Sequence, residues 1–441
     1  MRIQYTSLIV SLTRFLTPQV WKEAHQTHRP KKTSSRWDLQ PLLMTLLLMT
    51  WTTGNSENER FETARAFYVA CHQHSRRPGK TLQGFQQALT KLPLPVLHAL
   101  FAGVRQCLQH VFHRYWRSDG FLVMACDGSR LECPRSAALE KRLQPSGKKD
   151  SAPMLMVSAL VLLPAGLLWA WCVGPGNASE HDLLRQLLPT LPRRTLLVAD
   201  AFYQGYDLYT AILEAKMSFL VRASSRSRLY TDTKTTRTRF REGLVWYWPE
   251  EAQNKNRPPL RLRAIRVRGA KKKDVWLLTN VLDPQRLGRR RAAEIYRWRW
   301  GVEGVFRIYK RTLPKIKLWS RTEALVYKEA EVSLLGLQLL LMQAASSTRR
   351  GEEGTVIVMG SARVELLRVR GAITTTIGER LGPWQRRWYQ DRLAQIQSGG
   401  LGRKVRRKWP RRKDHKAPKP PKIRVLPRAL KAKMARRMHA A

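Results

Sequence analysis

The feature that most constrains the fold is an apolar stretch at residues 153–173, PMLMVSALVLLPAGLLWAWCV. Its length would be enough to span a bilayer. However, Pro164-Ala165-Gly166 interrupts it in the middle, and the Val, Leu and Trp runs on either side are typical of two buried strands joined by a tight turn. We therefore predict a β-hairpin, which places this part of the chain in a sheet.

Two further apolar runs predict buried strands, and each is followed by an acid. Residues 121–126 (FLVMAC) precede Asp127, and residues 195–199 (TLLVA) precede Asp200. A single acid after a strand most often belongs to a turn. Here two such acids occur in one region, and ligands bind at the carboxyl ends of parallel strands. We therefore predict that Asp127 and Asp200 lie at strand ends and face one site.

The order of elements around these strands indicates an α/β fold with a mixed sheet. Ser179 predicts the start of a helix over residues 180–188, and a second helix (206–217) and a short strand (219–221) follow. Residues 225–280 contain strand-like segments separated by basic turns, which indicates an inserted β-subdomain. Helices are predicted before and after this core, notably at 39–51, 95–115 and 326–345.

The helix predicted over residues 294–310, EIYRWRWGVEGVFRIYK, carries an unusual pattern of charge. At about 100° per residue, one stripe along the border of its apolar face contains a single acid, Glu303, together with Tyr296, Arg299, Arg307 and Lys310. A solvated helix surface is the ordinary explanation of a charged stripe. One acid among several cations is poorly suited to surface ion pairing, however, and is suited to binding a polyphosphate.

The net charge of the chain indicates its partner. Lys and Arg number 81 against 32 Asp and Glu, so the formal charge is +49 over 441 residues. Such a chain repels itself unless it meets a polyanion, and nucleic acid is the expected one. A membrane surface would require an insertion element, and we predict none. We also predict no signal peptide, because the N-terminus lacks an apolar core followed by small residues.

The five cysteines, Cys71, Cys107, Cys126, Cys133 and Cys172, are scattered, which is typical of reduced thiols in a cytosol. Cys71 and Cys107 each have histidines nearby in the sequence, His72 and His74 for the first and His110 and His113 for the second. Neither group has a standard zinc-ligand spacing, so we do not expect a zinc site.

The spacing Tyr296-x2-Arg299-x3-Glu303-x6-Lys310 matches the YREK signature of insertion-sequence DDE transposases, and the chain resembles that family over about residues 119–345. The resemblance implies an RNase H-like fold and cut-and-paste DNA transposition. It also implies that Asp127, Asp200 and Glu303 are the catalytic triad. Tyr296, Arg299 and Lys310 then match residues that hold the phosphate near the cut, and Arg307 lies on the same stripe.

Three converging acids without paired bases repel one another, which a divalent cation would relieve. Oxygen ligands favour Mg²⁺ or Mn²⁺, and two such ions per active site would serve phosphodiester chemistry. The resemblance further implies a hairpin intermediate and a tryptophan that stacks on a flipped base. Trp276 is the candidate, with packing in a strand core as the equal alternative; Trp246 and Trp248 fit less well.

These observations predict a sequence of regions along the chain. They are a helical DNA-binding region (1–118), the RNase H-like core (119–224 and 281–345), the β-subdomain (225–280), a helical extension (346–400) and a basic disordered tail (401–441). We expect double-stranded DNA as partner, a homodimer when assembled on DNA, and a cytoplasmic, nucleoid-associated prokaryotic protein. A nuclease without strand transfer and a non-catalytic, domesticated DNA-binding protein are the two alternatives.

Overall fold

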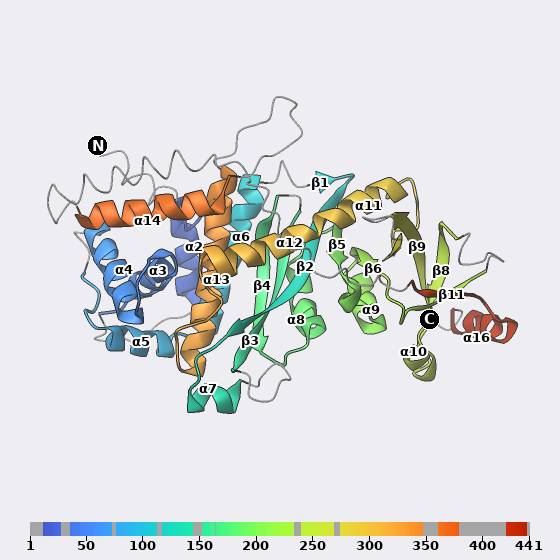
Figure 1. Cartoon of the computed structure of the whole chain (residues 1–441), viewed down its shortest axis with the longest axis horizontal. Coiled ribbons are helices and arrows are strands. Elements are labelled where there is room, and N and C mark those ends of the chain that lie inside the picture. Colours follow the sequence, from blue (N-terminus) through green and yellow to red (C-terminus); the bar gives the residue numbers. More distant parts are fainter. Residues whose placement is uncertain are drawn as a thin grey trace, which may run out of the picture.

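In a computed structural model, the chain is elongated, with helices at one end, a sheet in the middle and further strands at the other end (Figure 1). The structure describes residues 12–27, 36–72, 76–112, 117–143, 152–163, 165–232, 240–268, 274–346, 360–378 and 420–438. Among these residues, no helix is both long and apolar enough to cross a membrane.

Five strands form the central part of the sheet. They are β2 (Phe121–Glu132), β3 (Met154–Leu162), β4 (Leu167–Pro175), β5 (Thr195–Ala199) and β6 (Ser218–Arg222). Their order is β4-β3-β2-β5-β6, with β2, β5 and β6 parallel and β3 antiparallel to both of its neighbours. The predicted hairpin is therefore confirmed as β3 and β4. The α/β class, with an RNase H-like mixed-sheet core, is also confirmed.

Helices connect and cover these strands. Between β2 and β6 they are α7 (Ala137–Arg142), α8 (Glu180–Leu187), the 3₁₀ turns η2 (Leu188–Thr190) and η3 (Ala201–Tyr203), and α9 (Tyr206–Glu214). Ser179 caps α8 as predicted, because its side chain accepts a hydrogen bond from the backbone N–H of Asp182 at 3.4 Å. Trp169, Leu197 and Phe219 are almost fully buried between the sheet and the helices that cover it.

The predicted β-subdomain extends the core sheet instead of forming a separate one. Its strands are β7 (Arg228–Thr231), β8 (Glu242–Tyr247), β9 (Leu260–Arg268) and β10 (Asp274–Thr279), with the short helix α10 (Glu250–Asn254) between β8 and β9. Because β10 pairs antiparallel with β6, the whole sheet contains eleven strands. The eleven include β1 (Arg117–Ser118), which pairs with β2.

The prediction of a disordered tail from residue 401 is wrong for the part of the tail that the structure describes. Strand β11 (Lys422–Val425) adds in parallel to the free edge of β7, and helix α16 (Arg428–Met438) follows it. The physical reason is an apolar contact: Met434 of α16 is 3% exposed although its neighbours are basic. Residues 401–419 lie outside the described residues.

The N-terminal region is helical, as predicted. Its helices are α2 (Pro18–Thr27), α3 (Leu39–Trp51), α4 (Glu57–Cys71), α5 (Leu82–Lys91) and α6 (Leu94–Phe112). The long helix α13 (Glu323–Ser346) stands between them and the sheet and is buried along almost its whole length. The predicted extension 346–400 is described only as α14 (Ala362–Gly378), which packs beside α4 and α13.

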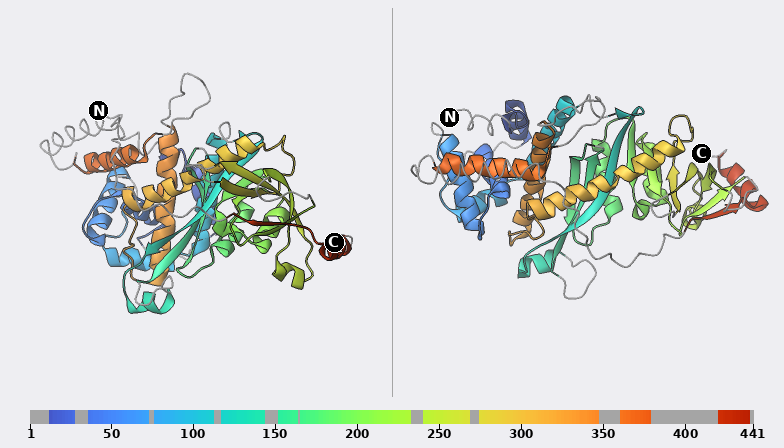
Figure 2. Two further views of the ribbon diagram at one scale, coloured as in Figure 1. Left: turned by 45° about the vertical axis from the view of Figure 1, so that its right-hand side comes forward. Right: turned by 45° about the horizontal axis from the view of Figure 1, so that its top comes forward.

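The predicted charged helix is not one regular α-helix. It consists of α11 (Arg289–Trp298), α12 (Trp300–Arg307) and a π-helical turn, η5 (Ile308–Thr312). Together they run across one face of the sheet (Figure 2). Gly301 allows this close approach, because a Cβ at this position would touch the side chain of Leu163 after β3. Because of the π-turn, a uniform α-helical projection does not apply beyond Arg307, and the predicted direction of Lys310 stays a prediction.

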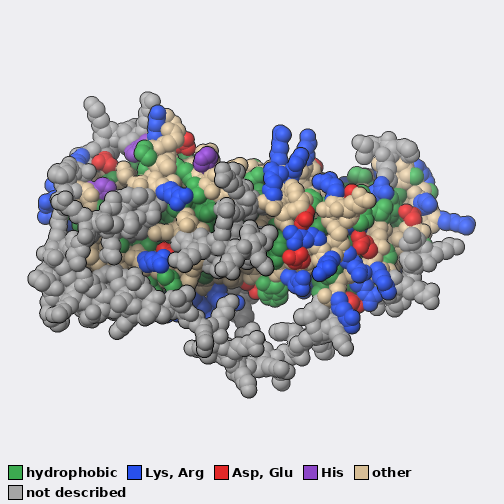
Figure 3. Space-filling model, turned by 90° about the horizontal axis from the view of Figure 1, so that it is seen from above, with side chains coloured by type: hydrophobic (Ala, Val, Ile, Leu, Met, Phe, Trp, Pro, Cys, Tyr) green, Lys and Arg blue, Asp and Glu red, His purple; other side chains and the backbone are tan. Residues whose placement is uncertain are grey.

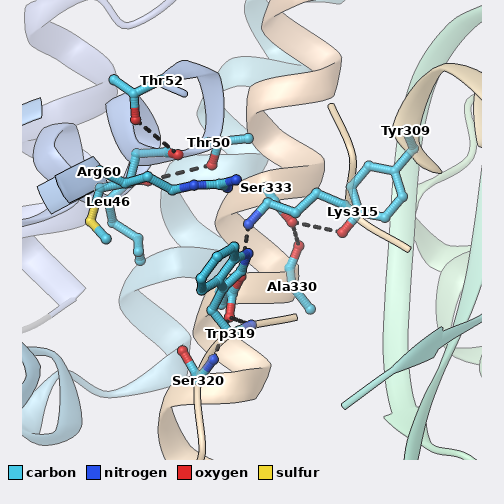
Figure 4. Close-up of polar contacts among 12 residues, drawn as sticks. Leu46, Thr50, Thr52, Arg60, Tyr309, Lys315, Trp319, Ser320, Ala330 and Ser333 are labelled. Carbon is cyan, nitrogen blue, oxygen red and sulfur yellow. Dashed lines mark hydrogen bonds and ion pairs between the residues drawn. The ribbon is translucent and has the colours of Figure 1, made fainter. Parts of the chain in front are cut away.

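The chain after η5 is anchored on α13 by polar contacts (Figure 4). The Lys315 ammonium and the Glu329 carboxylate form a buried ion pair at 2.7 Å, and the backbone N–H groups of Trp319 and Ser320 donate to the other Glu329 oxygen. The Tyr309 hydroxyl lies 2.7 Å from the Ser333 hydroxyl. Every oxygen of Glu329 is thus paired, and the end of the charged helix is fixed in place.

Candidate active site

Asp127 lies in the middle of a strand, not at its end. Strand β2 continues to Glu132, but its parallel partner β5 stops earlier, since Ala125 pairs with Val198 and the next residues of β2 pair only with β3. Asp127 is therefore placed just past the carboxyl end of the parallel part of the sheet. The prediction of a strand end is wrong for β2, yet the expected position relative to the sheet is correct.

Asp200 directly follows β5, as predicted. It begins the 3₁₀ turn η3, and its Oδ1 accepts a hydrogen bond of 2.7 Å from the backbone N–H of Phe202. Because β2 and β5 are adjacent and parallel, Asp127 and Asp200 emerge at the same edge. The two carboxylates are close enough for Asp200 to raise the pKa of Asp127.

Glu303 belongs to the first turn of α12 and pairs with Arg299. The guanidinium of Arg299 lies 3.2 Å from Glu303 Oε1. The Arg299 side chain is 9% exposed and that of Glu303 is 37% exposed. The carboxylate therefore faces outward while the arginine below it is buried.

Arg299 is the centre of the site. Its guanidinium lies 4.8 Å from the Trp300 ring centre and 6.0 Å from that of Tyr296. Burial works to lower its pKa, but Tyr296, Glu303 and Asp127 outweigh that effect and raise it. Its Nε–H is buried and has no hydrogen-bond acceptor in the structure. A buried cationic donor that lacks an acceptor is costly, and an anionic ligand would remove that cost.

The environment of Asp127 is unusual for an acid. Burial raises its pKa to about 6, and repulsion from Asp200 and Glu180 adds to the increase. The N–H of Gly128 and the charge of Arg299 oppose it. Tyr296 belongs to the same electrostatic group, because Arg299 lowers the pKa of its hydroxyl and Asp200 raises it, while burial raises it most. Asp127, Asp200, Tyr296 and Arg299 thus influence one another, and Glu303 is linked to them through Arg299.

The other three predicted site residues are placed differently. Lys310 is half-buried in the π-turn, where burial lowers its pKa, and Arg307 is exposed. Trp276 is only 4% exposed and packs against Phe240 with ring centres 5.8 Å apart. The structure therefore favours the packing alternative for Trp276, whose ring is not available to a base in this conformation.

Sequence reasoning missed three residues around the acids. Phe202 and Trp300 are large aromatic side chains that are 60% and 62% exposed. Each lies within a few residues of an acid, next to a half-buried charged group. Glu180, at the start of α8, is a fourth carboxylate beside Asp127. The aromatic residues left no periodic signal, and Glu180 looked like an ordinary acid in the first turn of a helix.

Carboxylate oxygens are the donors that Mg²⁺ and Mn²⁺ prefer, so the chemistry of Asp127, Asp200 and Glu303 fits these ions. Across the described part of the chain, however, no three His, Cys, Asp or Glu side chains are close enough together to hold a metal ion. The pairing of Glu303 with Arg299 accounts for this, since the carboxylate is turned to the guanidinium.

A hollow of about 460 Å³ lies between α8, α9 and the β-subdomain but does not contain the acids. Its walls include His181, Gln204 and several charged side chains. Two of its arginines are paired with carboxylates, Arg257 with Asp207 and Arg228 with Glu250. The hollow is therefore a weaker anion site than the acid end of the sheet, where Arg299 retains a donor without an acceptor. Lys and Arg side chains, with several Asp and Glu side chains among them, are spread over the top face of this half of the molecule (Figure 3).

Comparison with known proteins finds a family that part of the chain resembles. Residues 119–335 match the family model described as "Transposase DDE domain". The solved structure of the piggyBac transposase synaptic complex with hairpin DNA is similar at a TM-score of 0.43 and 12% identity, covering 90% of this chain and 86% of that chain. No curated protein gives a match. The likeness to the solved structure is too distant to add to the assignment. The stretch from 119 to 335, which contains all three acids, is thus similar to a transposase DDE domain.

Proposed function

We propose that this chain is a DNA transposase that cleaves the ends of its insertion sequence and joins the 3′-hydroxyl ends to target DNA. The observation that carries the proposal is the grouping of Asp127, Asp200 and Glu303 around Arg299, within the stretch that matches the transposase DDE domain. The net charge of +49 supports DNA as the substrate, because phosphate contacts dominate the affinity for DNA.

In this proposal the acids and Arg299 have different roles in the reaction. Asp127, Asp200 and Glu303 would hold two Mg²⁺ or Mn²⁺ ions, which activate a water or a 3′-hydroxyl and stabilise the leaving oxygen of a phosphodiester. Arg299 would donate its Nε–H to a phosphate oxygen, since that donor has no acceptor among the described residues. Trp300 and Tyr296 hold the guanidinium between them, so that the phosphate meets a preorganised donor.

Three finer features belong to the proposal. They are a hairpin intermediate on the flanking DNA, assembly of a homodimer on the DNA, and a gripping role for Lys310 and Arg307. Base stacking would accompany a hairpin. Trp276 would have to leave the ring of Phe240 to stack on a base, whereas Trp300 is already exposed beside Arg299. Trp300 is thus the better placed of the two rings.

The test is a cleavage and joining assay with the full-length protein. The end substrate is built from the DNA that flanks the gene, where the proposal expects short inverted repeats, and the products with Mg²⁺ are followed on gels. A transposase releases 3′-hydroxyl ends and joins them to a second duplex. Asp127→Asn, Asp200→Asn and Glu303→Gln should each abolish cleavage while DNA binding stays near that of the unaltered protein.

The alternatives predict other products. A nuclease of the same fold would cut without joining, and a non-catalytic protein would bind without cutting. A variant of one of the three acids that still cuts at the normal rate would remove that residue from the site.

A further inference from the structure

Phe202 is a large apolar side chain that the fold leaves in water beside an acid. It is the second residue of the 3₁₀ turn η3, two positions after Asp200, and it is 60% exposed. Burial of a phenylalanine side chain stabilises a fold, and most of that gain is forgone here. Among the aromatic residues that the structure describes, only Trp300, which also stands near an acid, is comparably exposed.

The backbone of Phe202 is fixed on both sides. Its N–H donates to Asp200 Oδ1 at 2.7 Å, and its carbonyl oxygen accepts a hydrogen bond of 2.8 Å from His181 Nε2. A carbonyl oxygen can only accept, so this imidazole nitrogen carries a proton. Because the acid itself makes one of the two bonds, the backbone of Phe202 cannot move away from Asp200 without breaking that bond.

Two aromatic neighbours restrict the Phe202 ring. The rings of His181 and Tyr203 are inclined to it at 71° and 84°, with ring centres 5.6 and 6.0 Å away. Such edge-to-face arrangements are favourable for aromatic pairs. Tyr203 is only 1% exposed, so one of the two supports belongs to the core. The exposed ring is therefore oriented before any ligand arrives, which lowers the entropy cost of binding.

The charges around Phe202 indicate what kind of ligand would cover it. His181 and Gln204 belong to the wall of the 460 Å³ hollow, which thus begins next to the ring. Five Lys and Arg side chains line this hollow against three acids, namely Arg185, Arg226, Arg228, Lys255 and Arg257 against Asp207, Glu250 and Glu251. A nucleotide presents a flat ring together with a phosphate, so it fits an open aromatic ring flanked by an excess of cations.

We propose that Phe202 is a stacking residue for an unpaired nucleobase of the DNA strand that lies at Asp200. The inference rests on the proposed function for the identity of that strand, but it does not require a hairpin intermediate. A base inside a duplex is already stacked on its neighbours, so the ring favours DNA in which a base has left the helix. Since every base has a flat face, this contact selects unpaired bases and not a sequence.

The experiment measures binding of the full-length protein to two duplexes of one sequence, with Ca²⁺ in place of Mg²⁺ so that binding is followed without cleavage. One duplex is fully paired, and the other contains a single unpaired 2-aminopurine, whose fluorescence falls when it stacks. The unaltered chain should bind the second duplex on the order of tenfold more tightly and quench its fluorescence. Phe202→Ala should lose both the preference and the quenching, whereas Phe202→Tyr, which keeps a ring, should retain them.

The matched control is Ile316→Ala, because Ile316 is an apolar side chain that is 54% exposed in another part of the molecule. This variant should behave like the unaltered chain. Phe202→Ala should also keep the melting temperature of the unaltered chain, since an exposed ring adds little to the core.

Three results would overturn the proposal: no preference for the unpaired base in the unaltered chain, an undiminished preference in Phe202→Ala, or an equal loss in Ile316→Ala. A loss in Trp300→Ala that is absent in Phe202→Ala would likewise assign the stacking to Trp300 and reject Phe202. If the preference depends on Phe202 but the chain neither cuts nor joins DNA, the proposed function fails while this inference stands. Cutting and joining without any preference would be the reverse case.

Discussion

Two glutamate–cation pairs, one within the charged helix and one just after it, differ in how many of their polar atoms have hydrogen-bond partners. Lys315 and Glu329 are 5% and 9% exposed, and both oxygens of the carboxylate have partners. Arg299 and Glu303 are 9% and 37% exposed, and the Arg299 Nε–H has no acceptor. The first pair is closed, whereas the second is open to a ligand.

The difference separates a structural role from a functional one. Burial favours a neutral Glu329, yet Lys315 and two backbone N–H groups outweigh burial and lower the pKa of Glu329. Such a pair can stabilise the fold, but its carboxylate oxygens are already paired and are not free to bind another molecule. Arg299 is equally buried and is left with an unmet donor, which the fold alone does not require. Arg222 and Arg263 also have a buried Nε–H without an acceptor, so the unmet donor of Arg299 marks the candidate site only because it lies beside Glu303 and Asp127.

The largest effect on stability should come from the closed pair. Lys315→Met would leave the buried Glu329 carboxylate without its cation and should lower the free energy of unfolding by about 3–5 kcal/mol. Urea denaturation of the full-length protein measures the change. Lys317→Met is the matched control, because Lys317 pairs with Glu132 at 3.2 Å on the surface and should cost under about 1 kcal/mol. Similar losses for the two variants would mean that the closed pair is not special.

A change in the open pair should alter the rate of DNA cleavage and leave the stability of the fold unchanged. Arg299→Lys keeps the charge but loses the planar guanidinium, so a phosphate held by it would be misplaced. The single-turnover rate of cleavage should fall on the order of a hundredfold, while duplex affinity barely changes. Arg297→Lys, at an exposed position of α11 that has no assigned role, is the control and should cut normally. If binding and cleavage fell in parallel for Arg299→Lys, this arginine would be one more cation of a basic surface.

Exposed cations differ from both pairs, and those on α16 allow their contribution to DNA binding to be measured. Here Lys431 lies 4.0 Å from Asp232 with both side chains largely exposed, so solvent screens the pair. Met434→Glu should detach α16 from the sheet edge and weaken duplex binding several-fold, with a smaller salt slope. Ala435→Glu makes the same charge change at an exposed position. An equal loss in both variants would show that charge alone matters and that docking of α16 does not.

The sequence predicted the strands and helices that carry the candidate site well where near neighbours decide the outcome. The apolar runs before Asp127 and Asp200, and the spacing of Arg299 and Glu303 on one helix, all depend on near neighbours. The hydrophobic periodicity of the sequence could not reveal that β2 extends beyond the end of β5, because strand register is set by pairing partners far away in the chain. The π-turn at Ile308–Thr312 is likewise not visible in the periodicity of the sequence.

Longer-range packing explains the other errors. The tail after residue 401 reads as a polycation, and one buried side chain, Met434, decides that its last part docks as a strand and a helix. A buried tryptophan such as Trp276 cannot be distinguished by sequence from an exposed one such as Trp300.

The smallest predicted effect concerns Asp127, whose charge is only partly compensated. Burial raises its pKa from 3.8 to about 6, so the folded state holds the proton more tightly than the unfolded chain. Its contribution to stability is therefore present at low pH and is lost as the pH rises through about 6. Asp127→Asn cannot ionise and should escape this loss. In EDTA, the variant should gain stability relative to the unaltered protein between pH 4 and about pH 7. Urea denaturation at several pH values measures the difference. If the difference in unfolding free energy between the two proteins did not change with pH, the charge of Arg299 would already compensate that of Asp127. The site would then need no ligand to compensate the charge of this acid.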